Sequence, residues 1–168
     1  EKTAQLDIGF EQQHGAWNTW ASAYAGLIND FILVRYNAPN ASQMYPLANN
    51  VDATIAGAEA GVGYQFNEHL QADLSAMYAW GENTTDNKPL PQIAPLEGRL
   101  NLRYVQEKYS LGLLWRAVAE QNRISLNDGN IVGYDMGKSK AFSTLAMNAT
   151  YKYSDALDFS VGIDNLLD

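Results

Sequence analysis

Apolar and polar residues alternate along most of this 168-residue chain, and this alternation limits what the chain can fold into. In the segment 70–80 every even position is Leu, Ala, Tyr or Trp, and Asp73 falls at an odd position. A period of two predicts β-strands, because a helix would place apolar residues three and four positions apart. The pattern also predicts strands at residues 4–10, 58–66, 96–104, 109–117, 145–153 and 157–163. A further strand is expected within 16–36, where the aromatic and alanine residues fit either facing.

Charged residues within the predicted strands lie between the apolar positions. Asp73, Arg116 and Lys152 are examples, and several glycines share their parity. The resulting sheet has one apolar face and one face that is charged, polar or small. The apolar face can point inward, as in a soluble sandwich or a lipocalin-like barrel, or outward to lipid around a wet lumen.

Three features favour the outward arrangement. The predicted strands run to about ten to fourteen residues, and a tilted strand needs about nine to eleven to cross a bilayer. Aromatic residues gather near the strand ends, where the membrane interfaces would lie. Short turns alternate with long polar segments, the turns at 12–15, 67–69, 107–108 and 154–155 and the long segments at 37–50, 81–95 and 122–140. We therefore predict an all-β fold: an antiparallel up-and-down transmembrane β-barrel segment of about eight strands, with short periplasmic turns and long extracellular loops.

Composition excludes several classes of function. A net charge of −8 without a basic stripe argues against nucleic-acid binding. The absence of cysteine excludes disulfides, thiolate metal sites and cysteine nucleophiles. No stretch approaches the roughly 18 apolar residues of a membrane-spanning helix. The sequence opens on a strand pattern rather than a signal peptide, so we expect its beginning to be missing.

Three segments are similar to the C-terminal barrel of TonB-dependent outer-membrane receptors. They are residues 1–9, 90–100 and 161–168, the last of which ends in the sequence N-L-L-D. In that family such a segment ends the penultimate strand, ahead of one more loop and a closing strand. The resemblance covers essentially the whole chain and is greatest to the copper-receptor branch.

The resemblance implies a barrel of about 22 strands, filled by an N-terminal plug domain, in the outer membrane of a Gram-negative bacterium. Such receptors take up ferric siderophores, vitamin B12, haem or copper with energy passed through TonB. Residues 1–168 would then be a partial barrel that lacks the plug domain and the last strand. The implied partners are outer-membrane lipid, the receptor's own plug domain, the remaining strands and, through the plug, the TonB complex. Copper would be cargo of the full receptor, and no cofactor is expected on this segment.

No catalytic or cofactor-binding motif is found in the sequence, and we predict that the chain is not an enzyme. His14 and His69 fall in predicted short turns, where a surface role is expected rather than metal ligation. Met44 and Met136 are weak candidates for metal binding, because thioethers suit Cu(I) and both residues fall in predicted external loops. An incidental position is the simpler interpretation for both. By resemblance, the metal-binding residues of the copper branch lie in the plug and the earlier strands.

A set of charged residues is expected to face the lumen. They could contact a plug or line a path for cargo, although pairing between neighbouring strands is the simpler explanation. The set comprises Glu97, Arg99, Arg103, Arg116 and Glu120.

Two alternative functions fit the same alternation. About eight strands can close into a self-contained outer-membrane barrel with a structural or adhesive role. A soluble lipocalin-like binding protein would instead need the apolar face turned inward. An upstream plug and a downstream closing strand would distinguish the receptor from the small barrel.

Overall fold

The computed structural model describes residues 1–40, 43–129 and 137–167, and their side chains outside 37–44. Within these ranges every helix or strand element is a β-strand, as predicted. They are β1 (Lys2–His14), β2 (Trp17–Asn40), β3 (Gln43–Gln65), β4 (Leu70–Asn83), β5 (Lys88–Pro89), β6 (Glu97–Val105), β7 (Tyr109–Val118), β8 (Phe142–Ser154) and β9 (Leu157–Ile163). In this part of the chain no helix has the length and apolar character needed to cross a membrane.

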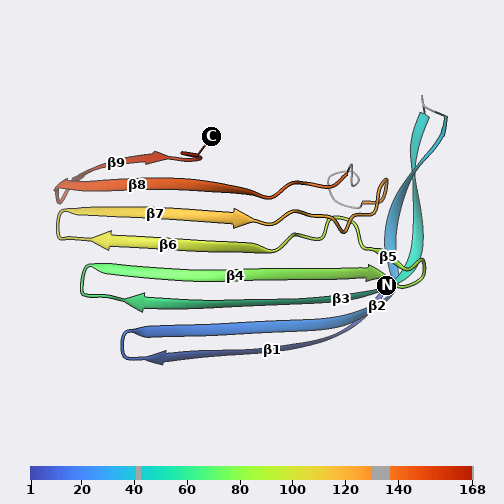
Figure 1. Ribbon diagram of the computed structural model, residues 1–168, viewed down its shortest axis with the longest axis horizontal. Coiled ribbons are helices and arrows are strands. Elements are labelled where there is room, and N and C mark those ends of the chain that lie inside the picture. Colours follow the sequence, from blue (N-terminus) through green and yellow to red (C-terminus); the bar gives the residue numbers. More distant parts are fainter. Residues whose placement is uncertain (41–42, 130–136, 168) are drawn as a thin grey trace.

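The strands form one antiparallel sheet in the order β1-β2-β3-β4-β6-β7-β8-β9, and the two-residue β5 pairs with β4 (Figure 1). Short turns lie at one end of the sheet and the longer connections at the other (Figure 1). Among the described residues β1 pairs only with β2 and β9 only with β8, so the sheet is open at both edges. A closed small barrel would pair its first strand with its last. The chain therefore has the form of a wall section.

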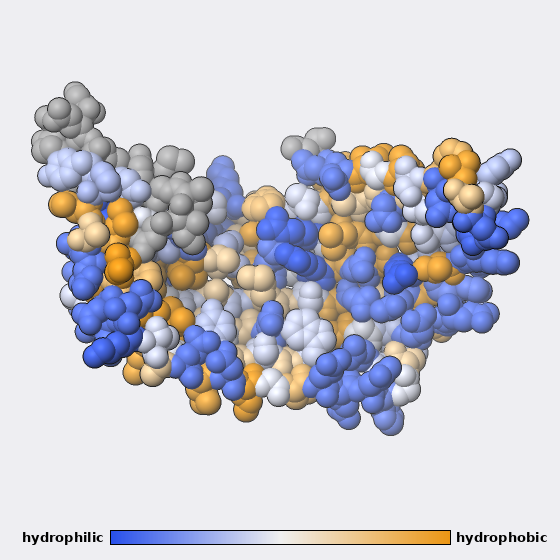
Figure 2. Space-filling model, turned by 180° about the vertical axis from the view of Figure 1, so that it is seen from behind, coloured by the Kyte–Doolittle hydropathy of each residue, from blue (hydrophilic) through white to orange (hydrophobic). Residues whose placement is uncertain are grey.

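The strand register separates apolar from polar side chains. Phe10 lies opposite Ala21, Ala21 opposite Ala60, and Ala60 opposite Ala76, so these residues share one side of the sheet, here called the apolar face. The other side, which carries Trp20, is called the polar face. Seen from behind in Figure 2, hydrophilic side chains lie over the middle of the sheet as well as at its ends.

The apolar face has no cover within the described chain. On β1, Leu6 and Ile8 are 74% and 71% exposed. The buried apolar residues among those described cluster instead toward the end of the sheet with the long connections, at Ile28, Leu33, Val51, Ala53, Leu90 and Val118. A lipocalin-like fold would pack its apolar face into a core. Here the apolar face is instead exposed on the outside of the sheet.

The facing of β2, which the sequence left open, is set by its pairing with β1 and β3. Trp17, Ala23 and Leu27 belong to the apolar face, because they lie opposite His14, Ile8 and Ala4. Trp20 and Tyr24 belong to the polar face. The alternation of β2 is blurred because aromatic residues occur on both of its sides.

The short turns agree with the predicted segments, with one shift. The β1–β2 turn consists of Gly15 and Ala16, and Gly15 adopts a left-handed φ of 57°. His14 is therefore the last residue of β1, opposite Trp17, rather than a turn residue. His69 does lie in a turn, and its Nδ1 atom is 3.0 Å from the carbonyl oxygen of Val105, which ties two neighbouring turns together.

The prediction of a long loop at residues 37–50 is wrong. β2 and β3 run to 24 and 23 residues and continue as a hairpin beyond the other strands. In Figure 1 this hairpin turns away from the strand direction and runs across the end of the sheet that carries the long connections. Its asparagines resemble a loop sequence, but a two-stranded hairpin outside the sheet has no need for an apolar face on every strand.

A β-bulge lies at the base of the hairpin. Ile28 pairs with Ala53 and Phe31 pairs with Val51, so two residues of β2 oppose the single Asp52 of β3. Asp30, in the bulge, has a left-handed φ of 56°. One extra residue reverses the parity of a strand. Odd-numbered residues of β2 beyond the bulge therefore turn toward the polar side.

Candidate functional site on the polar face and its loop junction

A three-residue ion cluster lies on the polar face of β6 and β7. Arg99 Nε is 2.6 Å from Glu97 Oε1, and Arg116 Nη2 is 2.6 Å from Glu97 Oε2. Arg99 and Arg116 are directly opposite each other on the paired strands. The Glu97 side chain is only 8% exposed, whereas those of Arg99 and Arg116 are 55% and 37% exposed. The carboxylate of Glu97 therefore bridges the two guanidinium groups, one through each of its oxygens.

The other two residues of the predicted lumen set do not join this cluster. Arg103 is exposed on the polar face, opposite Gln71 and Gly112, and makes no ion pair with a described residue. Glu120 lies two residues after the end of β7 and is also exposed. The structure thus brings three of the five predicted residues together.

Charge is unevenly divided over the polar face. β1 to β4 contribute Asp7, Glu11, Glu59 and Asp73, and below the bulge they contribute no lysine or arginine. β6 and β7 contribute three arginines and the single Glu97. Whatever packs against this face therefore meets an acidic half and a basic half.

A loop junction closes the end of the polar face that carries the long connections. Leu90 and Ile93, from the β4–β6 connection, pack with Ile28, Ala53 and Ile55 of the sheet. Leu90 is 4% exposed. We call Leu90, Ile93 and the sheet residues beneath them the seat.

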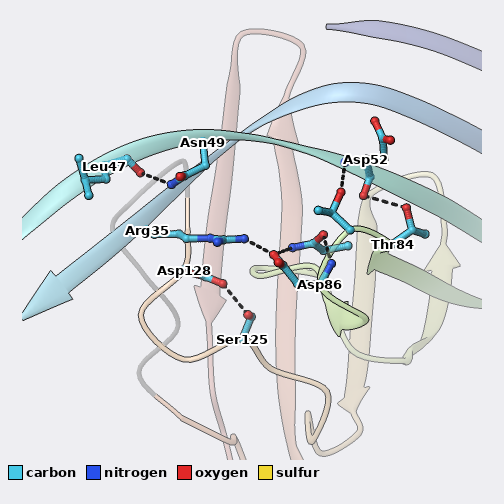
Figure 3. Close-up of polar contacts among 10 residues, drawn as sticks. Arg35, Leu47, Asn49, Asp52, Thr84, Asp86, Ser125 and Asp128 are labelled. Atoms are coloured by element: carbon cyan, nitrogen blue, oxygen red, sulfur yellow. Dashed lines mark hydrogen bonds and ion pairs between the residues drawn. The ribbon is translucent and has the colours of Figure 1, made fainter.

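Polar contacts join the seat to the bulge. The backbone N–H of Thr84 donates to the Asp52 carbonyl oxygen at 2.8 Å. The Asp52 N–H donates in turn to Thr85 Oγ1 at 2.8 Å. Figure 3 shows Asp52 and Thr84 facing each other where the hairpin leaves the sheet. The residue opposite the bulge thus fixes the start of the β4–β6 connection.

An ion pair bridges the hairpin and the same connection. Arg35 of β2 donates through Nη2 to Asp86 Oδ2 (Figure 3). Asn83 Nδ2 also donates to Asp86 Oδ2 at 2.7 Å, and the Asp86 N–H donates to Asn83 Oδ1 at 3.1 Å. These contacts lower the pKa of the Asp86 carboxyl, with the Asn83 hydrogen bond as the largest cause and Arg35 as a further one. Asp86 is therefore ionised at neutral pH.

The residues Gln121–Gly129 after β7 cross to the free side of the hairpin, and we call them the strap. Arg35 and Asp128 form an isolated antiparallel bridge. The Gly129 N–H donates to the Val34 carbonyl at 3.0 Å, and the Tyr36 N–H donates to the Asn127 carbonyl at 2.8 Å. The strap thereby connects β7 to β2, which are separated in the sheet by β3, β4 and β6.

Side chains of the strap also contact the C-terminal end of β4 and the seat. Arg123 Nη2 lies 2.5 Å from Glu82 Oε2, and its guanidinium carbon is 4.9 Å from the ring centroid of Trp80. Gln121 Nε2 donates to the Ile93 carbonyl at 2.8 Å. These residues were not singled out from the sequence. Neither the bulge that reverses the side of Arg35 nor its separation of 51 positions from Asp86 leaves a periodic signal in the sequence.

The structure does not bring the two candidate methionines into a described site. Met44 belongs to β3, but its side chain lies outside the described residues, as does Met136 altogether. Within the described part of the chain no group of three or more His, Asp or Glu residues could hold a metal ion.

A family model described as TonB dependent receptor-like, beta-barrel, matches residues 1–166. The chain belongs to this family. A solved structure of the copper transporter OprC matches with a TM-score of 0.92 and 43% identity, over 98% of this chain and 25% of that one. The ferric enterobactin receptor of Pseudomonas aeruginosa (TM-score 0.75, 14% identity, 99% and 26% covered) and the FrpB iron transporter of Neisseria meningitidis (0.69, 19%, 98% and 26%) share the fold.

The TonB-dependent receptor segment thus spans about a quarter of the length of these solved structures. No curated protein matches it. Its resemblance to the family, predicted from three segments, is confirmed, and so is the predicted all-strand antiparallel fold.

Proposed function

We propose that this segment forms part of the barrel wall of an outer-membrane receptor that imports copper. It would take part in uptake rather than catalysis. The observation that carries the proposal is the 43% identity with the copper transporter OprC across 98% of the chain, together with an apolar face that the described residues leave uncovered.

The exposed apolar face supports a position in lipid. Charged side chains in the middle of the long strands lie on the opposite side, as expected where one side meets hydrocarbon and the other a wet lumen. Aromatic pairs gather at the end with the short turns. The ring centroids of Trp17 and Tyr64 are 4.4 Å apart, and those of Tyr64 and Phe66 are 4.8 Å apart. Amphipathic rings prefer the boundary between hydrocarbon and water, and these pairs support a boundary beside the short turns.

The divided charge of the polar face supports a folded domain as its neighbour in the lumen. The receptor's plug would meet Arg99 and Arg116 on one side and the acids of β1 to β4 on the other. Guanidinium groups that lose water on docking need carboxylates or ordered water as partners. TonB would act through the plug, at a distance from this wall.

Copper as cargo is tested in the full-length receptor. A Gram-negative strain that lacks its own copper receptor should accumulate more copper when the full-length protein is expressed, and the same strain without TonB should not. The accumulated metal is measured by mass spectrometry after growth in limiting copper, with zinc and iron as controls for selectivity. Equal copper accumulation with and without the receptor would contradict the proposal. Recovery of the protein in the soluble fraction would contradict its position in the outer membrane.

A further inference from the structure

A groove on the apolar face runs across β6 to β9 near their short turns. We propose that it binds one membrane phospholipid, with an acyl chain in the groove and a headgroup of phosphate and primary ammonium at the turns beside it. The site depends on the proposed position of this segment in the outer membrane, and its ligand is distinct from the cargo. Two observations carry the proposal: the groove itself and the polar groups at its mouth.

The groove has a volume of about 300 Å³ and is lined by apolar side chains of neighbouring strands. Leu111, Ala149 and Val161 lie side by side in the strand register, and Ala149 has the smallest side chain of the three. Met147 and Val161, which border the groove, are 48% and 64% exposed. The described side chains therefore leave the hollow unfilled. A hydrocarbon chain is flexible enough to follow it and gains apolar contact along its length.

Polar groups gather at the end of the groove that lies beside the short turns. Tyr104 lines the groove, and its hydroxyl oxygen accepts a hydrogen bond of 2.7 Å from Gln106 Nε2. The ring centroid of Tyr104 is 6.1 Å from that of Tyr109 and 6.1 Å from that of His69. Tyrosine hydroxyls can donate to phosphate oxygens, and amphipathic rings lie at the level of lipid headgroups. The groove thus opens onto groups that suit a headgroup.

The two turns beside the groove carry charges of both signs. Glu107 and Lys108 are exposed in the β6–β7 turn, and neither forms an ion pair with a described residue. Glu68 is exposed in the β3–β4 turn, where its Oε1 atom is 3.5 Å from His69 Nε2. A headgroup with one phosphate and one ammonium complements this set, because Lys108 attracts the phosphate and the carboxylates attract the ammonium.

This mixture of charges selects among membrane lipids. An anionic headgroup without an ammonium would be attracted by Lys108 and repelled by Glu68 and Glu107. A quaternary ammonium has no N–H group to donate to these carboxylates. Phosphatidylethanolamine carries both the phosphate and a primary ammonium. The short turns lie together at one end of the sheet (Figure 1), the end expected to face the periplasm, so the lipid would belong to the periplasmic leaflet.

Native mass spectrometry of the full-length receptor tests the site. Receptor in detergent, without copper, is exposed to equal amounts of phosphatidylethanolamine, phosphatidylglycerol and phosphatidylcholine, and the fraction that retains one lipid is measured. Phosphatidylethanolamine should be retained about two- to fivefold more than either of the others, as expected for exposed ion pairs. Equal retention of the three lipids would overturn the proposal. Because no copper is present, this outcome does not depend on whether the receptor imports copper.

Two sets of variants separate the groove from the headgroup contacts. Ala149→Leu fills the groove and should lower the retention of phosphatidylethanolamine about tenfold, since fewer methylene groups are covered. Ala60→Leu adds the same group elsewhere on the apolar face and is the matched control. Leucine is favoured in contact with lipid, so both variants should fold. Unchanged retention in Ala149→Leu would contradict a lipid in this groove.

The headgroup contacts are tested by charge removal in the turns. The double variant Glu68→Gln, Glu107→Gln should abolish the preference for phosphatidylethanolamine over phosphatidylglycerol, because the ammonium loses its partners. Glu120→Gln, at the opposite end of the sheet, should leave the preference unchanged. A preference that persists in the double variant would overturn the assignment of these carboxylates to the ammonium.

Discussion

Trp20 lies across Gly61 on the polar face, where the two residues are directly opposite each other on β2 and β3. A Cβ atom at position 61 would lie 2.5 Å from the indole Nε1 atom. Tyr24 covers Gly57 in the same way, with its Cε1 atom 2.4 Å from a Cβ built there. An aromatic ring across a strand glycine restores packing that the glycine lacks. The rings lie along the wall, so this part of the polar face projects little into the lumen.

Gly61→Ala should destabilise the barrel because the new methyl group forces the Trp20 ring off the sheet. Overpacking of this kind costs about 1–3 kcal/mol. The expected result is a lower midpoint for heat-induced loss of the folded, gel-shifted form of the full-length receptor.

Gly98→Ala is the matched control for this prediction. Among the described residues, a Cβ at position 98 would have only the Ser75 carbonyl oxygen within 4 Å, at 3.8 Å, so the midpoint of Gly98→Ala should not fall. The double variant Trp20→Ala, Gly61→Ala should lose less than the two single changes added together. Strict additivity would show that ring and glycine do not interact.

Glu97→Gln should destabilise the wall because it leaves Arg99 and Arg116 facing each other without a shared anion. Removing the anion from a fully buried ion pair would cost more stability. These guanidinium groups are partly exposed and screened by solvent, so the expected loss of stability is about 1–2 kcal/mol. The double variant Glu97→Gln, Arg116→Gln should recover part of it. Glu120→Gln, which removes the same charge outside any ion pair of the described residues, should change little. Thermal midpoints at low and high salt measure both effects.

The sequence was sufficient to predict what depends on local periodicity. Alternation in segments such as 70–80 predicted strands and their apolar side, and the polar breaks between them predicted the short turns within a residue or two. The carboxylate of Glu97 was expected to pair across strands, and it does so with Arg116 of the neighbouring strand.

What could not be predicted depends on register and on contacts distant in sequence. The asparagines of residues 37–50 are typical of turns and predict a loop, whereas β2 and β3 extend through this segment. The bulge at Asp30 reverses the parity of β2 through one unpaired residue, and no composition signal marks that position. Arg35 reaches Asp86 only because of this reversal. The contacts of the loop junction therefore depend on the strand register and cannot be predicted from the sequence pattern.

Asp30→Gly should be neutral or slightly stabilising, whereas Asp30→Val should be destabilising. The φ of 56° at this residue lies in the left-handed region, which glycine adopts freely and a β-branched residue resists by about 1–2 kcal/mol. Thr54→Val, on the partner strand below the bulge, supplies a control for adding a valine in a regular extended position. The thermal midpoints of the three variants should follow the order Gly, then the Thr54 variant, then Asp30→Val. If the Asp30→Val variant were as stable as Asp30→Gly, the bulge conformation would carry no strain.

The Arg35–Asp86 ion pair should stabilise the junction at neutral and mildly acidic pH and be lost only in stronger acid. The pKa of the Asp86 carboxyl lies below its ordinary value of about 3.9, so the folded state binds fewer protons than the unfolded chain near that value. The contribution of the ion pair to stability is therefore complete when the pH is above the ordinary pKa of the carboxyl. It decreases as the pH falls through the lowered pKa of the folded state. Asp86→Asn removes the charge at every pH. The difference in thermal midpoint between the native receptor and Asp86→Asn should stay constant from about pH 8 to pH 5 and shrink below about pH 4. Asp155→Asn, which removes a carboxylate from a short turn at the other end of the sheet, controls for net charge. A difference that already vanishes at pH 6 would contradict a carboxylate held ionised by Asn83 and Arg35.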